Sequence, residues 1–341
     1  MADTLIAEGE LSALAVAALR GRGLALPDAE AAARVFVLAD LFGLSTHGVS
    51  RIPQYAARMP CGIDPAARPA ATRVAPGLVL LDGGNGVGPL VGMRALDAAL
   101  DAAREVGIAA CFVRGSNHFG PIMPYVWIAA EQGFASLVMT NATTTIAPWG
   151  GRDTRLGNNP LGIGVPGCEG ADPVILDMAM SVAARAKIRS ALARGEALPE
   201  GWAADADGRP TTDPAAALKG FLLPVGGHKG YGLAIMVDML AGLLSGAAYL
   251  TRVSSWVDAP EAPQDLGHMF VVLNVSRLAA PEALSAKLKD FAAIIHDTPP
   301  ADPANPVRLP GEREIALLRR QRAEGVRVAQ ADLDAMKALA A

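Results

Sequence analysis

The sequence predicts an α/β protein with helical segments at both ends of the chain. Short apolar runs alternate with helix-length segments in the middle of the chain, which is typical of strands that alternate with helices. Segments with helical periodicity occupy both termini. The 341 residues are 51% hydrophobic and 19% charged, which describes a packed globule long enough for one large domain or two ordinary ones.

Three helices are expected in the N-terminal part. The first spans Glu10–Arg20 and is ended by the glycines that follow it. The second begins at Pro27, with Asp28 as its N-cap, and ends near Gly43. Its apolar face comprises Ala31, Val35, Leu38 and Phe42. A third helix is expected to begin within His47–Arg51 and to continue to about Met59, which would place His47 and Arg51 on one face.

The middle of the chain alternates between strands and helices after a linker. Residues 60–77 are rich in proline and glycine and form the expected linker. The expected strands are Leu78–Asp82, Ile108–Val113, Phe134–Thr140, Ile163–Val165 and Val174–Met178. The expected helices are Pro89–Glu105 and Pro124–Gln132.

A long loop and a buried helix are expected in the C-terminal half. Residues 195–225 predict a surface loop or flap, and the segment 205–213 within it either covers a site or makes a dimer contact. A buried helix spans His228–Ser245. The remaining expected elements are a strand at Gly267–Val275, an amphipathic helix at Pro281–His296, an irregular stretch at Pro299–Pro310 and a helix from about Gly311.

The composition argues against several classes of protein. The net charge is −4 and no basic run is present, so bulk nucleic-acid binding is not expected. The N-terminus shows no secretory pattern and no apolar run is long enough to span a membrane, which favours the cytoplasm. Cys61, Cys111 and Cys168 form no CxxC pair, which fits a reducing compartment and structural thiols.

The segment Thr46–Arg51 (THGVSR) is the first candidate for chemistry. It places an imidazole, His47, four residues before a cation, Arg51. This pair suits the reduction of a 2-oxo acid, because the arginine can hold the carboxylate while the histidine gives the carbonyl oxygen its proton. A packed core histidine is the alternative. Arg51 favours catalysis, since no acidic residue lies nearby on that face to pair with it.

Two glycine-rich segments resemble nucleotide loops without matching them. Asp82–Gly88 fits no G-x-G-x-x-G pattern, and no acidic residue ends the next strand, so a Rossmann site is not expected. The segment is either a tight turn with positive φ or a set of backbone amides that face a ligand. Gly226–Gly230 lacks the Ser or Thr of a P-loop. Its Lys229 is either a solvated surface residue or a contact to a cofactor phosphate or ribose.

A second histidine loop, Gly115–Gly120 (GSNHFG), follows a predicted strand. Functional residues are common in such loops, so His118 is a candidate, and a hydrogen bond that orders the loop is the alternative. The five histidines form neither an HExxH motif nor a close pair, so no metal site is predicted. No G-x-S-x-G elbow indicates a serine hydrolase. His268 and His296 are interpreted as structural.

Together these segments resemble the malate/L-lactate dehydrogenase family of the second type, over about residues 5–315. The family includes sulfolactate, ureidoglycolate and 2,3-diketogulonate enzymes and the Δ1-piperideine-2-carboxylate reductases, and it is unrelated to the Rossmann-type lactate dehydrogenases. The motifs that carry the resemblance are Thr46–Arg51, Gly115–Gly120, Pro148–Gly151, Gly157–Pro160, Asp177–Ser181, Gly226–Gly232 and Leu309–Glu312.

The resemblance implies roles for individual residues. His47 matches the catalytic proton donor, with Thr46 where serine is usual, and Arg51 matches the arginine that holds the substrate carboxylate. His118 matches the second active-site histidine, which some members are thought to use as the base. Further substrate contacts are implied for Asn158 and Arg185. Cofactor contacts are implied for His118, Phe119, Gly120, Pro121, Ile122, Asn141, Asp177, Met178, Ala179, His228, Lys229, Arg308, Pro310, Gly311 and Glu312.

The implied fold is α/β but not doubly wound. A discontinuous nicotinamide-binding domain with a mixed sheet, residues 75–285, joins a helical substrate and dimer region built from both chain ends, residues 1–70 and about 290–341. Members of the family work as homodimers. The resemblance therefore implies a homodimer that acts on a small molecule with NAD or NADP, with NAD favoured, and the composition places it in the cytoplasm.

Three departures from the family pattern bear on function. Thr46 keeps a hydroxyl beside His47 with a stiffer rotamer. Asn158 stands where threonine or serine is more usual, and Lys187 stands where the imine-reducing branch tends to carry an acid. Lys187 favours a 2-oxo acid. The main hypothesis is NAD(P)-dependent interconversion of a 2-hydroxy acid and its 2-oxo acid. Reduction of a C=N bond to a cyclic or N-alkyl amino acid and a noncatalytic dimeric binding protein are the alternatives.

Overall fold

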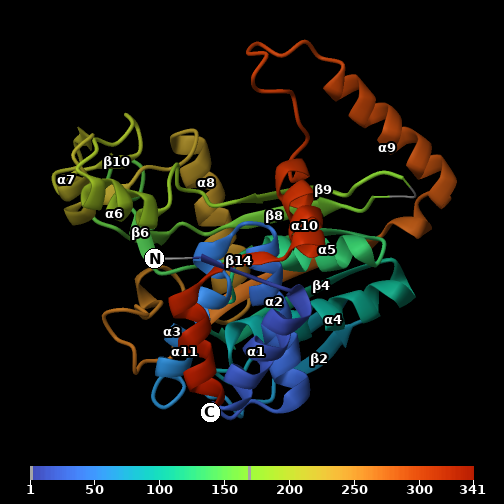
Figure 1. Ribbon diagram of the computed structural model, residues 1–341, viewed down its shortest axis with the longest axis horizontal. Coiled ribbons are helices and arrows are strands. Elements are labelled where there is room, and N and C mark those ends of the chain that lie inside the picture. The colour runs from blue at the N-terminus through green and yellow to red at the C-terminus, as the bar shows by residue number, and fades with distance from the viewer. Residues whose placement is uncertain (1–2, 168–169) are drawn as a thin grey trace.

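A seven-stranded sheet forms the centre of the protein, whose computed structural model describes residues 3–167 and 170–341 (Figure 1). The strands, in their order across the sheet, are β2 Ala70–Ala75, β3 Leu78–Asp82, β4 Ile108–Ser116, β13 Leu266–Asn274, β5 Phe134–Thr140, β8 Leu161–Val165 and β9 Val174–Met178. In this sheet β3 and β4 pair in parallel and the other neighbours pair antiparallel. The sheet is therefore mixed, as the resemblance implies. Cys168 lies outside the described residues.

Two helices cover one face of this sheet. Helix α4, Gly88–Val106, joins β3 to the parallel strand β4, and α5, Met123–Glu131, precedes β5. Alternate residues of β4, including Cys111 and Val113, are fully buried in the main core together with residues of α4 and α5. Burial raises the pKa of the Cys111 thiol to about 12, so this cysteine stays protonated, as a structural thiol should.

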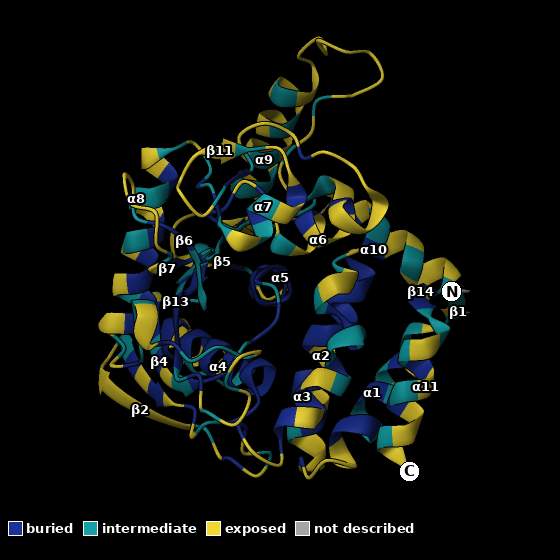
Figure 2. Ribbon diagram, turned by 90° about the vertical axis from the view of Figure 1, so that its left-hand side faces the viewer, coloured by how far each residue is buried: buried dark blue, intermediate teal, exposed yellow. Residues whose placement is uncertain are grey.

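A helical region built from both chain ends packs on α4 and α5. The N-terminal part supplies α1 Glu8–Arg20, α2 Leu26–Leu41 and α3 Ile52–Arg58, and the C-terminal part supplies α10 Glu312–Glu324 and α11 Gln330–Ala340. Strand β1, Asp3–Ile6, pairs antiparallel with β14, Val326–Ala329, so both ends of the chain lie in this region (Figures 1 and 2). Gln321 of α10 donates to the carbonyl oxygens of Asp40 and Leu41 at the end of α2.

A smaller five-stranded sheet lies beside the main one. Its strands, in order, are β11 Pro210–Thr211, β10 Ala203–Ala204, β12 Phe221–Leu222, β6 Thr144–Ile146 and β7 Leu156–Gly157. Helices α6, Arg185–Arg194, and α7, Pro214–Lys219, share its apolar core. The prediction of one long loop over 195–225 is therefore wrong in part, and α6 was not predicted. Strands of two residues are too short to show an alternating pattern.

The predicted buried helix from His228 is only half-buried. It comprises α8, His228–Val237, and a π-helical continuation, η3, Asp238–Leu243. One side packs on the sheet, but Leu233 and Leu244 are 49% and 60% exposed. Helix α9, Pro281–His296, has the predicted bounds, buries none of its residues and stands away from the body of the protein (Figure 1).

Two details of the N-terminal half differ from the sequence prediction. Ala25, not Asp28, is the N-cap of α2. The Asp28 carboxylate instead pairs with Arg94 of α4 at 2.7 Å, which ties the helical region to the sheet layer. The expected linker 60–77 contains the edge strand β2, whose residues are all exposed and so show no apolar alternation.

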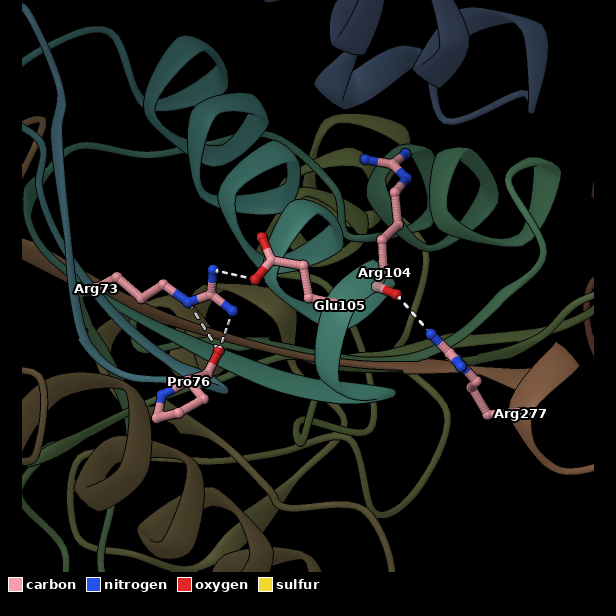
Figure 3. Close-up of polar contacts among 5 residues, drawn as sticks. All are labelled: Arg73, Pro76, Arg104, Glu105 and Arg277. Atoms are coloured by element: carbon pink, nitrogen blue, oxygen red, sulfur yellow. Dashed lines mark hydrogen bonds and ion pairs between the residues drawn. The ribbon is translucent and has the colours of Figure 1, made fainter.

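Polar contacts at the C-terminal end of α4 fix the edge of the sheet (Figure 3). Arg73 of β2 pairs with Glu105 at 2.8 Å and also donates to the carbonyl oxygen of Pro76 (Figure 3). Arg277, after β13, donates to the carbonyl oxygen of Arg104 at 3.2 Å (Figure 3). Orphan carbonyls at a helix end gain stability from such cations.

Candidate active site

The turn that carries His47 is shaped by a buried acid. Residues Ser45–His47 and Val49–Arg51 form two 3-10 turns with an extended Gly48 between them. The predicted third helix therefore begins only at Ile52, as α3, although it ends near Met59 as predicted. The Asp40 carboxylate accepts the N–H of Val49 at 2.8 Å, and a Cβ added to Gly48 would lie 2.1 Å from that carboxylate. Burial raises the pKa of Asp40 to about 7. Glycine is therefore required at position 48 by packing.

The His47 side chain faces the second histidine. The ring centroids of His47 and His118 are 5.7 Å apart and the rings are nearly parallel, at 25°. The Thr46 hydroxyl lies 2.9 Å from Nδ1 of His47. Burial, and secondly the Arg51 cation, lower the pKa of His47 to about 4, so that its imidazole is neutral at neutral pH.

Arg51 presents an unpaired cation beside these rings. Its Nε donates to the carbonyl oxygen of Thr46 at 2.6 Å, and one terminal nitrogen donates to Gln54 at 2.7 Å. Within 3–167 and 170–341 no acidic side chain pairs with it. The remaining guanidinium donors are free to bind the carboxylate of a ligand.

His118 is held by an aromatic cluster. The Tyr55 hydroxyl lies 2.6 Å from its Nδ1 and 2.7 Å from its backbone oxygen. The Trp256 ring meets the imidazole edge-on, with centroids 5.3 Å apart. Burial lowers the pKa of His118 well below its usual value, and the nearby His47 and Arg51 act in the same direction. The two histidines and the arginine predicted from sequence therefore form one site.

The glycine-rich segment 82–88 supports the His118 loop. Gly84 and Asn85 have positive φ values of 59° and 61°, which is the tight-turn interpretation. The side-chain amide of Asn117 donates to the carbonyl oxygen of Asn85 at 3.2 Å. A Cβ added to Gly88 would lie 2.0 Å from the carbonyl oxygen of His118. The start of α4 thus packs against the loop backbone.

Four residues of this site were not predicted from sequence: Asp40, Tyr55, Arg58 and Trp256. Arg58 is buried, and it donates to the carbonyl oxygens of Pro260 at 3.0 Å and Ala262 at 2.9 Å. Its guanidinium carbon lies 5.1 Å from the Trp256 ring centroid, so it holds the segment that carries this tryptophan. Helical spacing could have found Tyr55, which lies four residues after Arg51. No local pattern marks Trp256.

Asp177 joins the end of β9 to the start of α5. Its Oδ2 accepts the N–H of Met123 at 2.8 Å, and burial raises its pKa to about 6. The helix-start amides that a Rossmann-type site offers to a pyrophosphate therefore bind a carboxylate of the chain itself. This contact fixes the Phe119–Ile122 loop beside β9.

The C-terminal segment 308–312 also lies along β9. The carbonyl oxygen of Pro310 accepts the N–H of Ile175 at 3.0 Å. Gly311 has φ +87°, and a Cβ there would lie 2.8 Å from the carbonyl oxygen of Ile175. Glu312 pairs with His296 at 2.6 Å. Residues predicted to contact the cofactor from three distant parts of the sequence are thus brought together around β9.

Unpartnered groups near these segments suit a dinucleotide. Lys229 and Arg308 are exposed, and neither forms an ion pair with any residue that the structure describes. The Ser181 hydroxyl is buried and has no hydrogen-bond partner in the same residues. Phosphates need cations and ribose hydroxyls need polar partners, so these side chains fit a nicotinamide dinucleotide.

Met180 connects three predicted motifs. Its N–H donates to the carbonyl oxygen of Asn158 at 2.8 Å, and its carbonyl accepts the N–H of Val225 at 2.8 Å. Met178 and Ala179 precede it directly. The His228 ring, at the start of α8, meets Trp149 edge-on at 5.9 Å. The Asn158 loop and the glycine-rich entry to α8 therefore flank the end of β9.

Arg185 and Asn141 differ in how many hydrogen-bonding groups they leave for a ligand. Arg185, at the start of α6, donates one bond to the carbonyl oxygen of Leu218 at 2.7 Å. Burial lowers its pKa, and Asp258, two residues from Trp256, counteracts this effect. Asn141 is fully buried, and its side chain already accepts from the Gly267 N–H and donates to the carbonyl oxygen of Ala248. The geometry supports a ligand role for Arg185 more than for Asn141.

The other histidines have structural contacts. His268 is buried between the hydroxyls of Thr140 and Ser116, each 2.7 Å away. Across residues 3–167 and 170–341, no group of three or more His, Cys, Asp or Glu side chains could hold a metal ion. None of the helices in these ranges is long and apolar enough to cross a membrane.

Comparisons with known proteins agree with the motifs and the fold. The sequence profile of the malate/L-lactate dehydrogenase family matches residues 6–337. A protein named (2R)-3-sulfolactate dehydrogenase (NADP(+)) from Chromohalobacter salexigens is 35% identical, and the alignment covers 98% of this chain and 98% of that protein. A Delta(1)-pyrroline-2-carboxylate reductase from Ancylobacter novellus is 36% identical over 93% of this chain and 92% of that protein.

Comparison with solved structures finds the same kind of relatives. The solved structure of sulfolactate dehydrogenase from Methanocaldococcus jannaschii superposes with a TM-score of 0.91 at 33% identity, over 98% of this chain and 96% of that one. The noncatalytic binding protein, one of the alternatives from sequence, does not agree with such relatives. The chain belongs to the malate/L-lactate dehydrogenase family and is an oxidoreductase.

Proposed function

We propose that the protein interconverts a small 2-hydroxy acid and its 2-oxo acid with NAD or NADP. The unpaired Arg51 guanidinium beside the stacked rings of His47 and His118 carries this proposal. Such a cation binds the C1 carboxylate of the substrate and brings C2 and its oxygen next to the imidazoles. When bound, the nicotinamide supplies the hydride that C2 accepts during reduction.

His47 is the proton donor in this scheme, and its environment sets when it is charged. With a pKa lowered to about 4, it is neutral without a ligand. Burial is the larger cause of this lowering, and a substrate carboxylate on Arg51 offsets only the smaller cause, so binding raises the pKa of His47 in part. In this scheme His47 enters the reduction with a proton, gives it to the carbonyl oxygen, and accepts one when the hydroxy acid is oxidised. Thr46 orients the ring through its hydroxyl.

The cofactor contacts that we propose are the loop His118–Ile122, the end of β9 at Asp177–Ala179, Lys229, and the segment Arg308–Glu312. Sequence favoured NAD, whereas one relative is named as an NADP(+) enzyme. Both coenzymes therefore belong in the first assay. The substrate contacts that we add to Arg51 are Asn158 and Arg185, and the compartment that we propose is the cytoplasm.

Reduction of a C=N bond is the second candidate. Relatives named pyrroline-2-carboxylate reductases support it. Lys187 argues against it, since the imine-reducing branch tends to carry an acid there, and its ammonium lies 5.9 Å from the Trp202 ring centroid. An assay of pyruvate with methylamine against pyruvate alone separates the two reactions.

Absorbance at 340 nm tests the proposal. NADH and NADPH oxidation is measured against 2-oxo acids: pyruvate, oxaloacetate, 2-oxoglutarate, sulfopyruvate, diketogulonate and oxalurate, each with and without methylamine. Turnover of one acid without amine supports the proposal, and turnover only with amine selects imine reduction. No turnover with any acid or amine contradicts both.

Two variants test the assigned roles. His47→Ala should lower kcat by about 10²–10⁴-fold, the usual contribution of a general acid or base. Arg51→Ala should mainly raise KM. Arg34→Ala is the matched control, because this exposed arginine of α2 already has an acid partner, Glu131, at 3.6 Å. Unchanged turnover of His47→Ala would exclude this mechanism.

We also propose that the protein is a homodimer that pairs through the second face of the main sheet. On this face Leu80, Ile108, Ile163 and Val165 are 44%, 54%, 42% and 37% exposed. Helix α8 with η3 covers only the centre of the face, and its own outer side exposes apolar residues such as Leu233. A two-fold dimer places these apolar surfaces of two copies against each other.

Sedimentation tests the dimer. The protein and Leu26→Asp should sediment as dimers, and Ile163→Asp should shift toward monomer because it places a charge on the apolar face. Leu26 is a matched control, since it is 45% exposed at the start of α2, outside this face. A monomer at micromolar concentration, or an Ile163→Asp dimer as stable as the control, would contradict the proposed surface.

A further inference from the structure

Tyr55 makes two short contacts with one residue. Its hydroxyl oxygen lies 2.6 Å from Nδ1 and 2.7 Å from the backbone oxygen of His118. We infer that Tyr55 is a positioning residue that holds His118 in the tautomer with its proton on Nδ1, so that Nε2 presents a lone pair to the substrate. The chemical consequence of this inference rests on the proposed function, but the tautomer itself does not.

The two distances together decide where the protons lie. A carbonyl oxygen only accepts, so the Tyr55 hydroxyl must donate to the backbone oxygen of His118. That hydroxyl has one proton, and the contact to Nδ1 is then favourable only if Nδ1 carries a hydrogen and donates to the phenolic oxygen. The opposite arrangement would place two lone pairs 2.7 Å apart. The Gly120 N–H also donates toward Nδ1, a contact that would need a lone pair on that nitrogen, but at 3.4 Å it is outweighed by the 2.6 Å contact with Tyr55.

The tyrosine is placed rigidly enough to act in this way. Tyr55 is fully buried, and its ring meets Phe36 at 5.1 Å and Trp256 at 4.8 Å, both edge-on. The same Trp256 ring also contacts the imidazole of His118, so one side chain packs against both partners of the hydrogen bond. Burial raises the pKa of Tyr55, and the hydroxyl therefore keeps its proton.

The tautomer assigns different tasks to the two histidines. Nε2 of His118 has no hydrogen-bond partner among residues 3–167 and 170–341, and in this tautomer it can only accept. It can take a hydrogen bond from the hydroxyl of a 2-hydroxy acid, but it offers none to the oxygen of a 2-oxo acid. Donation to that oxygen is left to His47. The arrangement therefore favours binding of the hydroxy acid over the oxo acid.

Tyr55→Phe removes the hydroxyl and keeps the packed ring. The nitrogen shifts of His118, assigned by their loss in His118→Gln, should show Nδ1 protonated and Nε2 free in the unaltered protein, and a mixture of tautomers in Tyr55→Phe. KM for the hydroxy acid should rise by the inverse of the fraction that keeps the Nδ1 tautomer, about 2-fold for an equal mixture, while KM for the oxo acid does not rise.

Tyr125→Phe is the matched control for the nitrogen shifts. Tyr125 is also fully buried, and its hydroxyl donates to the backbone oxygen of Phe119, one residue beyond His118. This variant should leave the His118 tautomer unchanged. A proton on Nε2 in the unaltered protein, or an intact Nδ1 tautomer in Tyr55→Phe, would overturn the inference. The expected shifts without turnover of any hydroxy acid would refute the proposed function but leave the tautomer assignment standing.

Discussion

Replacement of Gly48 by alanine tests how the His47 turn is built. The backbone at Gly48 has a negative φ of −83°, so alanine meets no left-handed strain there and the contact of its Cβ is the main effect of the change. The new Cβ would lie 2.1 to 2.3 Å from the three carboxyl-group atoms of Asp40. The buried carboxylate must move, and its 2.8 Å bond to the Val49 N–H is lost.

The size of the effect follows from these contacts. Loss of a buried hydrogen bond to a charged group costs about 1.5–3 kcal/mol, and overpacking adds about 1–3 kcal/mol. For a chain of this size, about 2 °C per kcal/mol gives a fall in Tm of about 5–12 °C. The turn also holds His47, and a displacement of about 1 Å reduces kcat by about 10²-fold.

Thermal unfolding and steady-state kinetics measure both effects. Gly9→Ala in α1 is the control, because nothing lies within 4 Å of its added Cβ. It should raise the free energy of unfolding by up to about 1 kcal/mol, as alanine does in helices, and leave kcat unchanged. If Gly48→Ala matches this control in Tm and kcat, the packing argument for the turn fails.

Three further changes test other contacts. Folding raises the pKa of Asp40 from 3.8 to about 7, so its contribution to stability is present below pH 3.8 and is lost as pH rises through 7. The free energy of unfolding should fall over that range by up to about 4 kcal/mol, which a series of Tm measurements follows. Asp40→Asn should remove this pH dependence. Arg58→Lys leaves buried carbonyls without donors and should lower stability by about 2 kcal/mol, with faster proteolysis near Trp256. Gly311→Ala should weaken coenzyme binding by about 10-fold in a fluorescence titration, whereas Gly195→Ala, with φ +67° and open space around it, should not.

The sequence predicted those elements that local patterns define. Strands β5 and β9 have the predicted bounds because apolar runs follow directly on Gly133 and Pro173, which stop the preceding structure. The bounds of α9 were also correct. The division into domains at 1–70 and 75–285 remains a prediction.

The parts that failed depend on distant residues. The His47 turn is set by the Asp40 carboxylate of the preceding helix, and no periodicity in the turn reveals it. The His228–Ser245 segment is apolar, but what covers each of its sides is decided by other elements or by a second copy. Trp256 reaches the site because Arg58 binds carbonyl groups more than 200 residues later in the chain.

The pairing of β1 with β14 sets an order of events during synthesis. Thr4 donates a hydrogen bond to Gln330, 326 residues later, and Gln321 binds the end of the helix whose Asp40 shapes the His47 turn. A nascent chain therefore contains all its reactive histidines before the helices that brace them have left the ribosome. Contacts between such distant segments also form slowly. Variants truncated before α10 should consequently be inactive, although they contain every reactive side chain of the His47 site.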